Sequence, residues 1–90
     1  MGKEMGQLEQ FLATLKAKGF QLQEDAIGFI YFGKHFTNAP EDVIIAAIEL
    51  TLKAQKSFDG SFYISLLETF TVQKVQSRDD ALKLFNELLI

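Results

Sequence analysis

The chain has no cysteine and no tryptophan, and only one proline, one histidine and one arginine among its 90 residues. Without cysteine there can be no disulfide and no thiolate metal site, and this usage is typical of a reducing cytoplasm. No run approaches the roughly 20 apolar residues that span a bilayer, and no apolar signal region follows Met1. We therefore expect a cytoplasmic protein without a membrane partner.

The composition is sufficient for one hydrophobic core. A chain of this length buries roughly 60–65% of its unfolded surface, and 48% of its residues are hydrophobic. The net charge is −3 and the isoelectric point is near 5.0, whereas readers of duplex DNA normally carry a basic, arginine-rich face. We expect residues 1–90 to form a single domain that is not a dedicated DNA reader.

The most informative segment runs from Asn38 to Lys56. Asn38 is a good helix cap, Pro40 suits a first turn, and Glu41 can complete a capping box. Apolar residues then occupy most of the helical circumference: Val43, Ile44, Ile45, Ala46, Ala47, Ile48, Leu50, Leu52 and Ala54. The narrow polar stripe consists of Asp42, Glu49, Lys53 and Lys56. Such a helix needs cover on several sides, so we predict that residues 40–56 form the centre of the fold.

Two further helices are predicted from periodicity and capping. Between Lys3 and Lys18 apolar residues recur every three or four positions, and Gly19 lies where a left-handed helix end is expected. Ser77 can cap a helix that continues to the end of the chain. The predicted inner face of that last helix contains Ala81, Leu84, Phe85 and Leu88.

Residues 26–36 and 61–72 fit either a helix or a strand. The first segment is rich in aromatic and β-branched residues and holds two glycines, which favours a strand, but acids precede it and Lys34 and His35 end it, as a helix dipole prefers. In the second, only a helix keeps Glu68 away from the apolar face. We therefore predict an all-α bundle of about five short helices around the central one; the alternative is an α+β domain with a small antiparallel sheet.

The sequence contains no pattern that indicates catalysis, a cofactor or a metal. Its single histidine, His35, stands among aromatic residues, and its glycines lack the spacing of nucleotide-binding loops. No serine lies in a nucleophile elbow. Three acidic pairs, at 24–25, 41–42 and 79–80, each begin a predicted element, where carboxylates stabilise free amides. We expect a protein that is not an enzyme.

Four cations lie around residues 61–72: Lys53, Lys56, Lys74 and Arg78. If the neighbouring helices are antiparallel, these side chains can meet at one end and contact the phosphates of a nucleic acid. The alternative is that they are ordinary solvated side chains, with Lys53 paired to Glu49 one helical turn earlier.

Aromatic residues are abundant for so short a chain, with nine phenylalanines and two tyrosines. Most must lie in the core. The apolar tail of Leu88, Leu89 and Ile90 is expected to pack on the first helix, since an apolar chain end normally docks on a surface. The alternative is that the tail and part of the set Phe29, Phe32 and Phe36 form an oligomer or partner surface.

Part of the chain resembles the C-terminal helical domain of DnaD-like replication proteins. The residues that carry the resemblance are the runs at 43–49, 63–67 and 75–81, together with Lys56. The family signature is a tyrosine, an aliphatic residue four later and a tryptophan four after that. Tyr63 and Leu67 match it, while Thr71 takes the tryptophan position beside Phe70. The resemblance implies an all-helical, self-associating domain that contacts DNA or a helicase-loading partner through the matched positions and the neighbouring cations.

These observations predict a protein–protein or nucleoprotein assembly module, and the resemblance implies a role in DNA replication initiation. The candidate partner-binding residues are Tyr63, Leu67, Phe70, Leu88 and Leu89, and the candidate nucleic-acid contacts are Lys53, Lys56, Lys74 and Arg78. The alternative is a small acidic regulator, of phage or plasmid type, that blocks a basic nucleic-acid-binding surface on its target.

Overall fold

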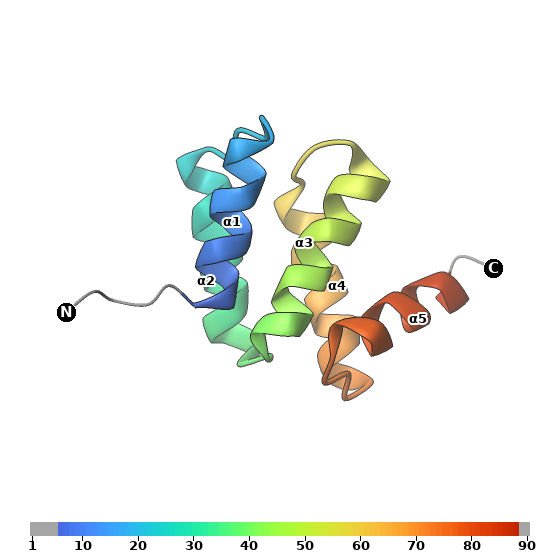
Figure 1. Ribbon diagram of the computed structural model, residues 1–90. Helices are drawn as coiled ribbons and strands as arrows, with labels where there is room; N and C mark the ends of the chain where they lie inside the picture. The colour runs from blue at the N-terminus through green and yellow to red at the C-terminus, as the bar shows by residue number, and fades with distance from the viewer. Residues whose placement is uncertain (1–5, 89–90) are drawn as a thin grey trace.

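The computed structural model describes residues 6–88, which form five α-helices and no strand (Figure 1). The helices are α1 (Gln7–Ala17), α2 (Glu24–Thr37), α3 (Glu41–Gln55), α4 (Gly60–Val72) and α5 (Arg78–Leu88). The prediction of an all-α bundle is therefore confirmed, and both ambiguous segments are helical. None of these helices is long and apolar enough to cross a membrane, as judged over the residues described.

Helix α3 is the centre of the bundle, as its broad apolar circumference predicts. It packs against each of the other four helices, with α1 on one side and α5 on the other (Figure 1). Its buried residues are Val43, Ile44, Ala46, Ala47, Ile48, Leu50 and Thr51. The buried Thr51 hydroxyl donates to the Ala47 carbonyl at 2.7 Å, so its burial leaves no polar atom unpaired.

The predicted N-cap of this central helix is wrong by two residues. Asn38 does not cap α3; it ends α2 in the left-handed conformation, with φ of 55°. The α3 cap is Pro40, which is extended at φ −59° and ψ 151°. Proline disfavours a helical conformation in the residue before it, so Ala39 is not part of α3. Asn38 tolerates the left-handed region better than most residues, which suits it to the end of α2.

Glu41 joins three helices instead of closing a capping box. One of its carboxylate oxygens accepts the Leu8 N–H of α1 at 2.9 Å, and the other accepts the Lys34 ammonium of α2 at 3.0 Å. These donors lower the pKa of Glu41, the Leu8 amide being the larger cause. The carboxylate therefore holds the start of α1 and the end of α2 against the start of α3.

Helices α2 and α4 approach closely because residue 33 is a glycine. A Cβ atom at Gly33 would stand 2.6 Å from Leu67 Cδ1 and 2.9 Å from Tyr63 Cε2. Helix α4 is capped by Asp59, whose carboxylate accepts the Phe62 N–H at 3.0 Å. Its buried face contains Tyr63, Leu66, Leu67 and Phe70, as the helical interpretation predicts, with Glu68 outside.

Helix α5 docks on α3 through Ala81 and Phe85. Ser77 caps it as predicted, since its hydroxyl accepts the Asp80 N–H at 3.1 Å. Leu88 was expected on the inner face but is 58% exposed. Helices α5 and α1 lie on opposite sides of α3 (Figure 1), so the prediction that the tail packs on the first helix is wrong for Leu88. Residues 89–90 lie outside the described part of the chain.

Candidate protein-interaction surface

Three of the predicted partner-binding residues belong to the core. Tyr63, Leu67 and Phe70 have no accessible surface, because this face of α4 packs against α2 and α3. Their assignment to a partner surface is therefore wrong for the folded domain. The same burial means that the tyrosine and aliphatic positions matched to the DnaD-like signature form an internal helix face here.

Tyr63 has a structural role that explains its burial. Its hydroxyl donates to the Ile30 carbonyl of α2 at 2.8 Å, and its ring lies 5.3 Å from that of Phe58. Burial raises the pKa of Tyr63 well above its usual value. The phenol therefore stays protonated at neutral pH and ties α4 to α2.

The largest exposed apolar side chains of α2 lie along one helix face. Phe29, Phe32 and Phe36 are 44%, 56% and 61% exposed, and their spacing of three and four residues places them in one row. The rings of Phe32 and Phe36 stack with their centroids 5.5 Å apart. Val72 of α4, 75% exposed, lines a hollow together with Phe36. We call Phe29, Phe32, Phe36 and Val72 the aromatic strip.

Two shallow hollows lie along the aromatic strip, one toward each end. The first is lined by Asp25, Gly28, Phe29 and Phe32. The second is lined by Phe36, Thr37, Glu68, Thr71 and Val72. Of the described residues that line the two hollows, Asp25 and Glu68 alone carry a charge. The surface is therefore apolar along its length and acidic at both ends.

The end of the strip nearest Asp25 is fixed in place by α4. The ring of Phe29 lies against Gly60, so close that a Cβ atom at residue 60 would stand 2.6 Å from Phe29 Cδ2. Gly60 is the first residue of α4. The strip is thus exposed to solvent, while the ring of Phe29 also packs against the backbone of α4 at Gly60.

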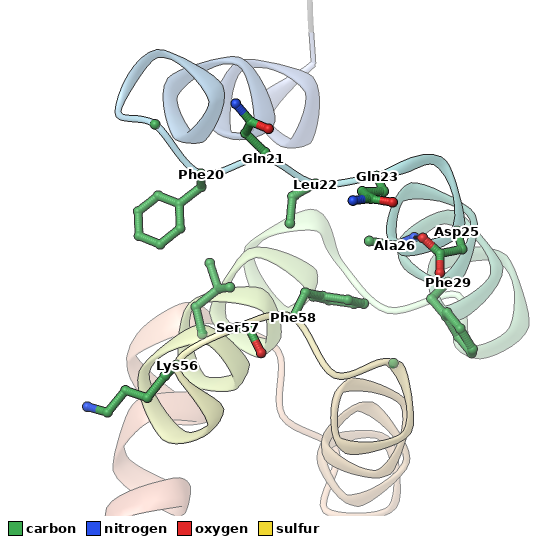
Figure 2. A pocket seen from close by; sticks show the side chains of 13 residues that line it. Phe20, Gln21, Leu22, Gln23, Asp25, Ala26, Phe29, Lys56, Ser57 and Phe58 are labelled. Atoms are coloured by element: carbon green, nitrogen blue, oxygen red, sulfur yellow. Dashed lines mark hydrogen bonds between the residues drawn. The ribbon is translucent and has the colours of Figure 1, made fainter.

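A cleft of about 460 Å³ adjoins this end of the strip, between the α1–α2 and α3–α4 connections (Figure 2). Phe20, Leu22, Phe29 and Phe58 contribute apolar side chains to its lining. Its charged groups, Asp25 and Lys56, come from opposite sides in Figure 2, and the Lys56 amine points away from the centre. The polar groups do not converge on a common point, as a catalytic or small-molecule site requires.

The four predicted nucleic-acid contacts are not gathered at one end. Lys56 caps the end of α3, whereas Lys74 lines a hollow with Pro40 at the start of α3, about 22 Å away along the axis. Arg78 binds Glu49 with two hydrogen bonds of 2.7 and 3.1 Å. Glu49 thus pairs with Arg78 of α5 rather than with Lys53, and these contacts raise the pKa of Arg78. Lys53 and Lys56 are exposed one helical turn apart.

The acidic pairs occupy helix starts, as predicted. Glu24 and Asp25 lie in the first turn of α2, Asp79 and Asp80 in that of α5, and residues 41–42 in that of α3. Within residues 6–88, no three histidine or acidic side chains lie close enough together to hold a metal ion.

The fold places the chain among small all-α bundles, and α2 presents an exposed aromatic face. The chain belongs to a family of unknown function (DUF6123), whose model matches residues 3–90. No curated protein and no solved structure matches the chain. Function therefore has to be argued from the surface itself.

Proposed function

We propose that this protein is a non-enzymatic assembly module that binds a protein partner through the aromatic strip. The observation that carries the proposal is the row of three exposed phenylalanines on α2, with the exposed Val72 at its end. Burial of apolar surface is the dominant favourable contribution to most protein–protein association, and aromatic residues are enriched at protein interfaces. Contiguous apolar area of this kind marks interaction sites on small proteins.

Site-specific photo-crosslinking in the cells that produce the protein tests this proposal. A photoreactive phenylalanine at position 32 lies in the strip, and the same group at Lys83 of α5 is the matched surface control. We expect a discrete protein adduct from position 32 that the control does not give. Equal adducts from both positions, or none from position 32, would contradict the proposal.

A more specific form of the proposal is a subunit of a replication-initiation complex that also contacts nucleic acid. It is supported by the resemblance to DnaD-like proteins and by the exposed pair Lys53 and Lys56 at the end of α3. A mobility-shift assay at low salt should detect DNA binding that Lys53→Glu/Lys56→Glu weakens, since each lost phosphate contact reduces affinity and salt dependence. If the folded protein shifts no DNA, the proposed DNA contact is contradicted, and the proposed assembly role is unaffected.

A further inference from the structure

The charges along the aromatic strip indicate what kind of partner it binds. Asp25 lies in the hollow at one end and Glu68 in the hollow at the other. Lys34 belongs to the same helix, but its ammonium is held by Glu41 at 3.0 Å. Lys56 lines the cleft that Phe29 also lines. Lys74 lines another hollow, together with Thr37 and Thr71. The two hollows of the strip thus hold one acid each and no lysine or arginine, and the nearest of these cations line the adjoining hollows.

A second copy of the chain is a poor occupant for this surface. In a two-fold contact with the α2 helices antiparallel, Asp25 of each copy meets the end of the strip that holds Glu68 of the other. In a parallel contact, Asp25 faces Asp25 and Glu68 faces Glu68. Each arrangement creates two pairs of like charges across the two-fold interface, and opposed like charges disfavour association.

We propose that the aromatic strip binds an amphipathic helix whose apolar face is flanked by lysine or arginine; this inference rests on the proposed function. The apolar side chains of such a helix cover Phe29, Phe32 and Phe36, and its cations pair with Asp25 and Glu68. From residue 25 to residue 36 the strip is roughly 16 Å long, which corresponds to three turns of a partner helix. Helices bind apolar surfaces in this way through anchors spaced three, four and seven residues apart.

Two designed peptides of four helical turns test the proposed chemistry. Both peptides carry leucine on one helix face. In one peptide all remaining positions are lysine, and in the other they are glutamate. Binding of each fluorescently labelled peptide to the full chain is measured by anisotropy at physiological ionic strength. We expect the leucine–lysine peptide to bind at least about tenfold more tightly than the leucine–glutamate peptide, a difference of about 1.4 kcal/mol.

Matched variants separate the site from general charge attraction. Asp25→Lys/Glu68→Lys should reverse the preference between the peptides. Asp79→Lys/Glu87→Lys changes the net charge equally but lies on α5, and should keep the preference. Phe32→Ser/Phe36→Ser should lower the affinity for the leucine–lysine peptide by about tenfold or more, and a tenfold change is about 1.4 kcal/mol.

The outcomes distinguish the inference from the proposed function. Binding of both peptides with equal affinity, dependent on Phe32 and Phe36, would overturn the inference and leave the strip as a docking surface. Binding that ignores Phe32→Ser/Phe36→Ser would contradict the proposed function. A dimer that light scattering detects and the same double variant dissociates would make a second copy the occupant. If neither peptide binds, the inference falls, and the crosslinking at position 32 decides the function.

Discussion

Helices α2 and α3 are neighbours in the chain, and both consist mostly of apolar residues, yet α3 is enclosed and α2 presents a row of rings to solvent. Four helices surround α3, whose small residues Ala46 and Ala47 let them approach. The principal packing partners of α2 are α3 and α4. The difference teaches that an apolar helix face is core only when the fold supplies an element to cover it.

The enclosed helix should be the more sensitive to loss of side-chain volume. Ile48 is fully buried, so Ile48→Ala leaves a cavity and should lower the free energy of unfolding by about 2–5 kcal/mol. Ile45→Ala is the control, because Ile45 is only partly buried on the same helix. Chemical denaturation measures both. If the two variants lose similar amounts of unfolding free energy, the α3 face that contains Ile48 is not the centre of the core.

The two faces of α2 should respond oppositely to the same small change. Gly33→Ala places a methyl group against Leu67 and Tyr63, and overpacking of this kind typically destabilises by about 1–3 kcal/mol. Gly28→Ala meets no atom within 4 Å, so it should stabilise the helix, by up to about 1 kcal/mol. Thermal unfolding of the two variants gives the comparison. A stabilising Gly33→Ala would mean that α2 and α4 are not closely packed.

The contact that joins α2 to α3 should depend on pH. Because the folded-state pKa of Glu41 lies below that of an ordinary glutamate, the contribution of this carboxylate to stability is present above the ordinary pKa and is lost as pH falls through the folded pKa. Glu41→Gln should therefore lower stability at neutral pH, by about 1 kcal/mol or less for a partly exposed ion pair. The deficit should shrink in acid.

Urea titrations at neutral and acidic pH measure this effect, with Glu87→Gln on the exposed face of α5 as the control. A deficit for Glu41→Gln that is equal at both pH values would show that the charge of the carboxylate is not what joins the three helices.

The smallest effect on folding is expected in the aromatic strip. Phe32→Ser/Phe36→Ser removes two exposed rings, and surface substitutions usually change stability by about 0.5 kcal/mol or less each. Phe70→Ala, in the core, should instead destabilise by about 3–5 kcal/mol. Differential scanning calorimetry of the two variants measures both effects. A collapse of stability in the double serine variant would place the strip in the core and remove it as a docking surface.

Much of the fold could be predicted from local chemistry. The apolar circumference of α3 and the Ser77 cap of α5 are properties of short segments, and both are present in the structure. The start of α3 was misplaced because Asn38 suits two roles, and the short connection to α2 decides between them. Helix α2 was ambiguous because the reason for Gly33 is contact with α4, which sequence spacing does not reveal.

The candidate surface was only partly predictable. Phe29, Phe32 and Phe36 form a row as soon as residues 24–37 are known to be helical, but their exposure depends on which elements lie nearby. Tyr63 and Phe70 are aromatic like the residues of this row, but they are buried. Their burial follows from the way that α4 turns toward α2 and α3, which is a property of the whole bundle.

The contact between Phe29 and Gly60 gives residue 60 control over a surface to which it contributes no side chain. Any side chain at that position has to displace the ring, so the edge of the strip can be reshaped from another helix without altering a single phenylalanine. In related chains we therefore expect the two positions to change together, a small residue at 60 accompanying a flat ring at 29. A family member with a bulky residue at 60 should carry a differently shaped strip and select a different partner.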